Sequence, residues 1–205
     1  QSFMFITGPE VTRVATHEEV SIESLGGPEV HAVGTGTCHA VLNTEADGMA
    51  WLKAVLTFLD PDLPSEDSLD RATLELTEII PTDQRRVYDM RKVIESIFDR
   101  GSFLENNALF GRGLLTFFAR LGGKAVAVLA NQPSVQAGCL DIDTSRKGAS
   151  FVELANSMGL PVVTLVDVPG YLPGQSQERG GILPFGALLL SAYGKATVPR
   201  ICLLV

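Results

Sequence analysis

The feature that most constrains the fold is a pair of continuous apolar runs in the second half of the chain, at Val162–Val166 and at 201–205. Neither run alternates between apolar and polar residues, and each follows a segment whose apolar residues have helical spacing. Strands of unbroken Val, Ile and Leu are typically buried on both faces, as in parallel sheets covered by helices. The sequence therefore predicts an α/β fold, in which right-handed crossovers bring the turns after Val128 and Val166 to one rim of the sheet.

Shorter signals predict further elements of this α/β unit. Strand-like runs at 114–119 and 125–130 flank Gly122-Gly123, and paired glycines suit a tight hairpin. A helix is expected over 90–97, and an amphipathic helix near 147–158. These elements make up the part of the chain that we expect to fold around one sheet.

The N-terminal part has a different pattern. Residues 3–7 read as a strand, followed by a Gly8-Pro9 turn and a short helix from Glu10. A longer helix is expected after Thr44, because Asp47 three residues later completes a capping pattern.

Between these two parts, 60–83 contains Pro61, Pro64 and Pro81 among many acidic and hydroxyl residues, which is typical of a linker. We therefore divide the chain into a first domain portion at 1–65, a linker at 66–83 and a second domain portion at 84–205.

Composition excludes several classes of function. A formal net charge of -8 argues against a general nucleic-acid or anionic-membrane partner, which would need a clustered basic surface. The three cysteines lie far apart without metal-ligand spacing, so we expect no zinc site and no disulfide framework, and a cytoplasmic protein. No apolar run approaches the roughly 20 residues of a membrane span.

The turn 167–174 is the first candidate for a binding site. It follows a buried strand and contains two prolines and two glycines, so it should be rigid and allow a ligand to approach the backbone closely. Such a turn can be a ligand-binding rim or a structural connection, and both interpretations stay open. Gln177 and Glu178 extend it, and these side chains could meet a ligand or only cap the next helix.

Other polar residues are weaker candidates. Ser145 is a plausible N-cap of the helix near 147–158. Arg120 ends an apolar strand, where it could anchor a carboxylate or phosphate or form a salt bridge at the sheet edge. Cys139 is disfavoured as a nucleophile because no histidine lies near it in sequence, and no metal or acid-base site is expected among the histidines. Neither a phosphate-loop lysine motif nor a dinucleotide glycine fingerprint occurs.

Taken together, these stretches resemble the carboxyltransferase β subunits of propionyl-CoA and acetyl-CoA carboxylases. The pair NQP–GCLD and VDVPGYLPG is the most specific part of the resemblance, which extends over nearly the whole chain. The matching segments are FITGP at 5–9, LGG at 25–27 with His31, 37–39, YDM at 88–90, FAR at 118–120, NQP at 131–133 with GCLD at 138–141, VDVPGYLPG at 166–174, 177–178 with 181–182, and ATVP at 196–199.

The resemblance implies a crotonase-like fold of ββα units and carboxyl transfer from N-carboxybiotin to the α-carbon of an acyl-CoA. A partner subunit with biotin carboxylase and biotin carrier domains would deliver the biotin. The carboxyltransferase subunits would assemble as hexamers, and the site would need no metal. We expect an internal piece of a longer polypeptide, holding the end of the first domain and the first half of the second. The oxyanion-hole segments would lie before Gln1 and after Val205, so this piece alone should be inactive and hold no catalytic residue.

The resemblance also assigns binding residues. The acyl-CoA-binding set is Phe103, Phe118, Arg120, Asn131 and Gln132. The biotin-pocket set is Asp167, Val168, Pro169, Gly170, Tyr171, Leu172, Pro173, Gly174, Gln177 and Glu178. Leu183, Pro184 and Leu188 stand where the family usually has Arg, His and Lys, and Tyr171 stands where Phe is commoner, which indicates a divergent paralogue with an unusual acyl chain.

Three other functions are considered beside this one. The nearest is the carboxyltransferase subunit of a biotin-dependent, sodium-pumping decarboxylase, which would use the same domain in reverse. The second is a non-catalytic scaffold that assembles with an active paralogue. The third is an acyl-CoA hydratase-like crotonase. That family lacks the NQP–GCLD and VDVPGYLPG motifs, both of which occur in this chain.

Overall fold

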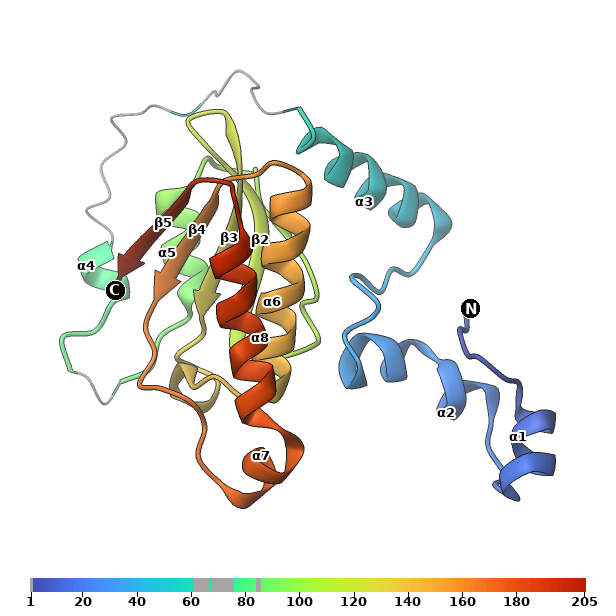
Figure 1. The fold of residues 1–205 in the computed structure, drawn as a ribbon. Coiled ribbons are helices and arrows are strands. Elements are labelled where there is room, and N and C mark those ends of the chain that lie inside the picture. Colours follow the sequence, from blue (N-terminus) through green and yellow to red (C-terminus); the bar gives the residue numbers. More distant parts are fainter. Residues whose placement is uncertain (1, 61–66, 68–75, 84–85) are drawn as a thin grey trace.

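The computed structural model describes residues 2–60, 67, 76–83 and 86–205. A five-stranded mixed sheet with the order β1-β2-β3-β4-β5 forms its centre (Figure 1). The strands are β1 (Leu104–Glu105), β2 (Leu114–Leu121), β3 (Lys124–Asn131), β4 (Val162–Val166) and β5 (Arg200–Leu204). The first three strands pair antiparallel, and β3, β4 and β5 pair parallel. The predicted α/β arrangement is therefore confirmed.

The hairpin between β2 and β3 forms where the glycine pair predicted it. Leu121 pairs with Lys124, and Gly122 and Gly123 between them have φ angles of 61° and 82°. Residues with a Cβ rarely adopt this left-handed conformation, which explains why glycine occupies both positions. Since the two strands run antiparallel, Leu114 at the start of β2 pairs with Asn131 at the end of β3.

Helices cover both faces of the sheet (Figure 1). On one face, α6 (Ile142–Ser157) and α8 (Ile182–Lys195) pack side by side against alternate residues of β2 and β3, such as Phe118 and Leu129. On the other face, α5 (Met90–Ile97) covers the intervening residues, such as Leu115 and Val128, and the short helix α4 (Leu76–Ile79) packs beside it. Burial on both faces explains the apolar sequences of β2, β3 and β4. The same expectation is wrong for 201–205, because β5 lies at the edge of the sheet and its residues are exposed.

The N-terminal part forms a series of helices beside this unit (Figure 1). They are α1 (Pro9–Thr16), α2 (Ile22–Gly26), the π-helical turn η1 (Val30–Gly34) and α3 (Glu45–Thr57). The capping prediction for α3 is confirmed, since the side chains of Thr44 and Asp47 exchange hydrogen bonds with each other's backbone N–H.

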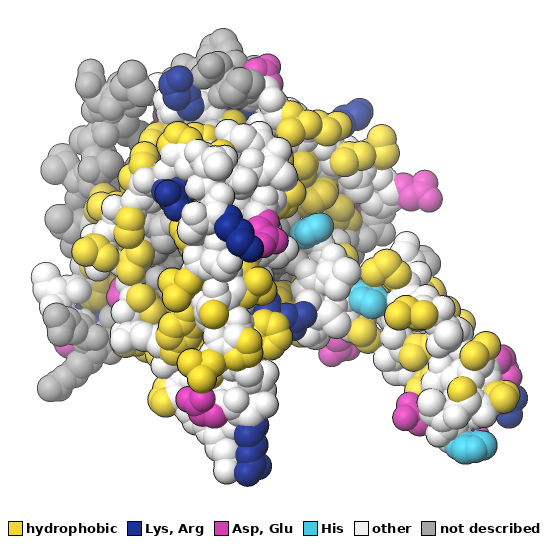
Figure 2. Space-filling model, in the orientation of Figure 1, with side chains coloured by type: hydrophobic (Ala, Val, Ile, Leu, Met, Phe, Trp, Pro, Cys, Tyr) yellow, Lys and Arg dark blue, Asp and Glu magenta, His cyan; other side chains and the backbone are white. Residues whose placement is uncertain are grey.

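The predicted strand at 3–7 is wrong. A strand needs a neighbour for its backbone hydrogen bonds, and among the described residues no strand lies beside this segment. The N–H of Met4 donates instead to the carbonyl of Gly26. Apolar side chains remain exposed here and over α8, as Figure 2 shows.

Two other local predictions change. The helix expected near 147–158 begins at Ile142, and its N-cap is Asp141, whose carboxylate accepts from Thr144 N–H at 2.8 Å. The prediction of Ser145 as N-cap is wrong, because Asp141 precedes it and Ser145 lies within the helix, where its hydroxyl donates to the Asp141 carbonyl. Half of the predicted linker 66–83 falls outside the described residues, and its described part contains the helix α4, so the domain boundaries stay predictions.

Candidate functional site

The turn 167–174 lies at the carboxyl end of β4, where it is anchored to a second loop. The N–H of Leu140 donates to the Gly170 carbonyl at 3.0 Å, and the N–H of Leu172 donates to the Leu140 carbonyl at 2.8 Å. Gly170 and Gly174 have φ angles of 147° and 139°, which favour glycine. The two loops therefore meet at the rim where the parallel strands end, the usual place for ligands in such sheets.

Asp167 begins the turn and is held from two directions. The hydroxyl of Tyr88 donates to its carboxylate at 2.7 Å, and its own N–H donates to Oδ1 of Asn131 at 3.3 Å. Burial, followed by the hydrogen bond to Asp167, raises the pKa of Tyr88 well above its usual value, so its hydroxyl keeps the proton it donates. Gly138 completes this contact, since a Cβ there would lie 2.5 Å from the Asp167 carbonyl oxygen.

A further set of hydrogen bonds ties the start of α5 to the same rim. Gln132 donates to Asp89 at 2.6 Å and accepts from the N–H of Met90 at 3.1 Å. Burial would raise the pKa of Asp89, but hydrogen bonds from Gln132 and from the N–H of Arg91, with the positive charges of Arg91 and Lys92, hold it below its usual value. The carboxylate therefore stays ionised as the N-cap of α5.

The end of the turn rests on the helical layer. The ring of Tyr171 packs against Gly186 in α8, where a Cβ would lie 3.0 Å from the tyrosine hydroxyl oxygen. The side chain of Gln177, in α7 (Gln175–Gly180), accepts from the N–H of Ile142 at 3.2 Å. Gln177 therefore contacts the N-terminus of α6, an earlier helix than the one that the sequence suggested it could cap, whereas Glu178 is exposed.

A largely apolar pocket of about 460 Å³ opens beside the turn. Val166 and Val168 bring the end of β4 and the turn into its wall. Two polar groups of the lining, the hydroxyls of Thr164 and Tyr193, bond to each other at 2.8 Å. Its lining residues are Leu114, Leu129, Asn131, Leu140, Thr164, Val166, Val168, Leu189, Tyr193, Arg200, Ile201 and Cys202. The rigid turn therefore borders a space suited to an apolar part of a ligand.

The structure does not bring the five predicted acyl-CoA-binding residues together. Asn131 and Gln132 lie at the carboxyl end of β3, whereas Arg120 pairs with Ala125 near the start of that strand. Phe118 is buried in the core between α6 and the sheet, and Phe103 packs on the opposite face beside α5. Asn131 accepts from the first residue of the turn, and Gln132 holds the start of α5.

Arg120 has a structural role at the opposite end of the strands, next to the β2–β3 hairpin. Its guanidinium donates to the carbonyls of Gly123, Thr57 and Asp60, at 2.7, 2.5 and 3.1 Å, and lies 5.5 Å from the ring centre of Phe58. These contacts join the β2–β3 hairpin to the end of α3.

Tyr88 and Asp89 were assigned no role from the sequence, although the YDM motif singled them out. Only the folded chain shows that they contact Asp167 and Gln132. Among residues 2–60, 67, 76–83 and 86–205, no group of His, Cys, Asp and Glu could hold a metal ion. Within those same ranges no helix is both long and apolar enough to cross a membrane.

Comparison with known proteins gives consistent matches. Residues 1–205 match the carboxyl transferase domain family. The chain is 42% identical to the propionyl-CoA carboxylase β chain of Roseobacter denitrificans, over 98% of this chain and 41% of that protein. It is 44% identical to the methylmalonyl-CoA carboxyltransferase 12S subunit of Propionibacterium freudenreichii, over 98% of this chain and 40% of that protein.

A solved structure agrees with these matches. The crystal structure of transcarboxylase 12S with methylmalonyl-coenzyme A and methylmalonic acid bound superimposes with a TM-score of 0.94 at 42% identity, over 98% of this chain and 40% of that one. The predicted crotonase-like fold is thereby confirmed. The chain spans about two fifths of the length of these relatives.

Proposed function

This chain belongs to the carboxyl transferase domain family, and we propose that it supplies part of the site where a carboxyl group passes from biotin to the α-carbon of an acyl-CoA. The observation that carries the proposal is the anchored turn 167–174 beside a largely apolar pocket. We assign this turn, with Gln177 and Glu178, to the wall of the biotin pocket.

The residues at the rim fit biotin in chemical character. The pocket next to the turn offers apolar side chains from β4, β5 and α8, which suit the hydrocarbon portions of the cofactor. Tyr171 is 43% exposed and presents its ring at the same rim. The hydrogen bonds that hold Asp167 and Leu140 keep the wall in place before a ligand arrives, which lowers the entropy cost of binding.

The chain's own contribution to the reaction is to bind and orient. When bound, carboxybiotin supplies the carboxyl group as CO₂, and its ring nitrogen accepts the α-proton of the acyl-CoA. The turn 167–174 would orient the cofactor, and the apolar pocket would exclude water from it. We expect the backbone amides that stabilise the enolate outside this chain, so the 205 residues alone should not turn over.

The partners and location follow from the same proposal. A biotin carboxylase and a biotin carrier domain would deliver the cofactor, and the full-length protein would associate with itself, as transcarboxylase 12S does in its hexamer assembly. We place the protein in the cytoplasm, which agrees with the three free cysteines of the described structure.

Two residues of α8 are relevant to which acyl-CoA is the substrate. Leu183 and Leu188 are 77% and 43% exposed, at positions where the family resemblance led us to expect basic residues. From this departure from the family pattern we infer an acyl-CoA whose chain differs from the propionyl group. Chain length is therefore the property to vary in an assay.

The test uses the full-length protein with its biotin carboxylase and carrier partner. Labelled bicarbonate should enter acyl-CoAs of increasing chain length in an ATP-dependent reaction that avidin blocks. Tyr171→Ala should raise KM for carrier-borne biotin, whereas Leu121→Ala should not, because Leu121 is an exposed residue beside the β2–β3 hairpin, at the opposite end of the strands. Absence of avidin-sensitive incorporation into every acyl-CoA tested would refute the proposal.

A further inference from the structure

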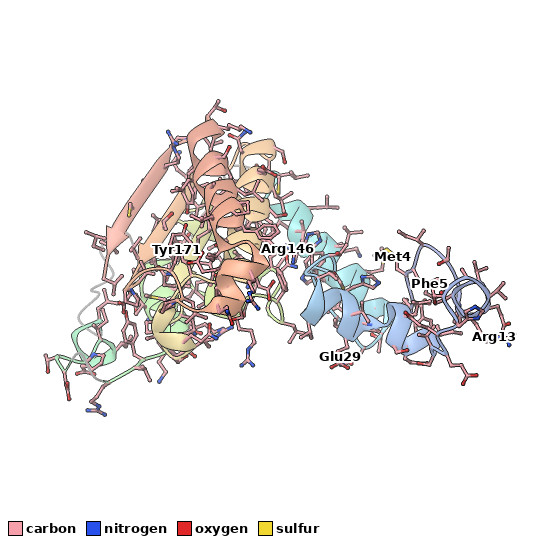
Figure 3. All side chains as sticks on the ribbon, turned by 60° about the horizontal axis from the view of Figure 1, so that its bottom comes forward. Met4, Phe5, Arg13, Glu29, Arg146 and Tyr171 are labelled. Atoms are coloured by element: carbon pink, nitrogen blue, oxygen red, sulfur yellow. The ribbon has the colours of Figure 1, made fainter. Side chains whose placement is uncertain are left out.

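A second cavity, of about 290 Å³ and with a mixed polar and apolar lining, lies between the N-terminal segment and the helical layer. Figure 3 shows Arg146 on the side of α8 that faces the N-terminal helices, with Tyr171 on the other side. The cavity is lined by Thr35, Gly36, Thr37, Asn107, Phe110, Arg146, Lys147, Ala149, Ser150, Glu153, Phe185 and Leu188. Hydroxyl, amide and cationic groups therefore converge on one space.

Lys147 is the most unusual of these groups. It is 4% exposed, and its ammonium donates to the Phe110 carbonyl at 2.9 Å. An ammonium carries three N–H groups, and within the described residues this is its one hydrogen bond and no carboxylate forms an ion pair with it. Burial disfavours the charged form of the amine and lowers the pKa of Lys147 to about 8, although the negative charge of Glu105 opposes this shift.

Arg146, the preceding residue, is held in a fixed orientation. Its guanidinium carbon lies 5.4 Å from the ring centre of Phe110 and 5.7 Å from that of Phe185. The same group donates to the Thr35 carbonyl at 3.3 Å and approaches the Asp143 carboxylate at 3.5 Å. Two aromatic contacts and a backbone acceptor thus orient the planar guanidinium before any ligand binds.

We propose that this cavity binds a phosphate group, held by Arg146 and Lys147. A guanidinium offers two parallel N–H groups to a tetrahedral oxyanion, and an adjacent ammonium adds a second charge. Thr35 and Thr37, whose hydroxyls lie 2.8 Å apart, line the wall contributed by the N-terminal segment. Glu153 is the one acidic residue of the lining and it is exposed, so solvent screens its charge.

Bound phosphate would join two parts of the chain. The loop 35–37 is already tied to the sheet unit, because the amide of Asn107 donates to the carbonyls of Gly36 and Cys38 at 2.7 and 3.2 Å. An anion between this loop and α6 would add contacts to both sides. Its binding should therefore raise the unfolding temperature in proportion to the logarithm of its concentration once the site saturates.

Two sources could supply the phosphate group: free inorganic phosphate, or the 3′-phosphate of coenzyme A. The second source rests on the proposed function. The position is compatible with it, since Phe185 lines the cavity while the next residue, Gly186, packs against Tyr171 of the turn. The cavity and the proposed biotin wall thus meet the same turn of α8.

The experiment measures binding of inorganic phosphate, coenzyme A and dephospho-coenzyme A to the full-length protein by calorimetry. Arg146→Gln and Lys147→Met should each weaken binding of the phosphate-bearing ligand about tenfold or more, as expected for loss of a charge-assisted hydrogen bond. Glu153→Gln should strengthen it roughly two- to fivefold, because a repelling surface charge is removed. Lys195→Gln, an exposed cation at the end of α8, should change nothing.

The ligands separate the two sources. Tighter binding of coenzyme A than of dephospho-coenzyme A, lost in Arg146→Gln, identifies the 3′-phosphate, and binding of inorganic phosphate alone identifies the free anion. Lys147 is buried, so the inference is judged on Arg146→Gln and Glu153→Gln if Lys147→Met fails to fold. Binding that neither of these two variants alters, or no binding of any of the three ligands, overturns it. Carboxyl transfer is measured in a separate assay, so failure of the phosphate site and failure of the proposed function give different results.

Discussion

The hydroxyl of Tyr88 and the carboxylate of Asp167 form a hydrogen bond of 2.7 Å across 79 residues of sequence. This contact joins the segment before α5 to the first residue of the turn after β4. With the bond from Asp167 N–H to Asn131, it fixes the start of the proposed biotin wall from two sides. The position of the wall therefore depends on residues that do not belong to it.

Tyr88→Phe removes this hydroxyl and keeps the ring. We expect a loss of roughly 1 kcal/mol in the free energy of unfolding, since the acceptor is charged but the site is only partly buried. KM for carrier-borne biotin should rise, while KM for acyl-CoA stays unchanged. Urea denaturation and steady-state kinetics of the full-length protein check both. Unchanged stability together with unchanged kinetics would show that the hydrogen bond does not position the turn.

Gln132→Leu tests the link between the NQP loop and α5. Gln132 is 1% exposed and uses both ends of its amide, so leucine would leave the N–H of Met90 and the Asp89 carboxylate without this partner. We expect a loss of about 2–4 kcal/mol, because buried polar groups without partners are costly. Gln175→Leu, at an exposed position, is the matched control and should lie within about 0.5 kcal/mol of the wild type.

Gly138→Ala and Gly159→Ala form a second matched pair. Both glycines have similar positive φ angles, 75° and 73°, so the conformational strain of alanine should be alike. A Cβ at Gly138 would lie 2.5 Å from the Asp167 carbonyl oxygen, whereas nothing lies within 4 Å of one at Gly159. Gly159→Ala should cost about 1–2 kcal/mol and Gly138→Ala clearly more. Equal losses of unfolding free energy in the two variants would show that the turn moves away from the added methyl group without a measurable loss of stability.

Lys147 predicts a pH dependence of stability. Its pKa falls from 10.5 to about 8, chiefly through burial, with Arg91 also lowering it and Glu105 opposing. Between these values the unfolded chain binds more protons at this site than the folded chain, so the free energy of unfolding rises with pH from about 8 to 10.5. Below pH 8 both states carry the proton and this contribution is flat.

The rise should total about 3 kcal/mol. It is measured as the difference between wild type and Lys147→Met, because methionine does not titrate. Parallel pH curves for the two proteins would contradict the assignment of a buried, titrating amine.

Local patterns predicted the elements of the sheet unit well. The unbroken run of β4 predicted burial on both faces, the Gly122-Gly123 pair predicted the hairpin, and Thr44 with Asp47 predicted the start of α3. The strand at 3–7 failed because an extended segment becomes a strand only when another strand pairs with it.

The contacts of single polar residues were harder to predict, because they depend on segments that lie farther away in the chain. Ser145 has the chemistry of an N-cap, but Asp141 begins the helix four residues earlier. Arg120 ends an apolar strand as expected, yet its guanidinium contacts carbonyls of the hairpin and of the segment after α3. Asn131 and Gln132 were singled out as ligand contacts, and the structure adds that Asn131 bonds to Asp167 of the turn and Gln132 to Asp89 before α5.

The sequence by itself determined the α/β class, the hairpin and the rigid turn 167–174, because apolar spacing and glycine and proline positions act over a few residues. It also determined family membership, through the NQP–GCLD and VDVPGYLPG motifs. Only the tertiary structure decided what holds that turn and what surrounds Lys147. Tyr88, Asn131 and Asp167, like Arg146 and Thr35, come together only when the sheet and its helices pack, and no local pattern encodes contacts between segments so far apart in the chain.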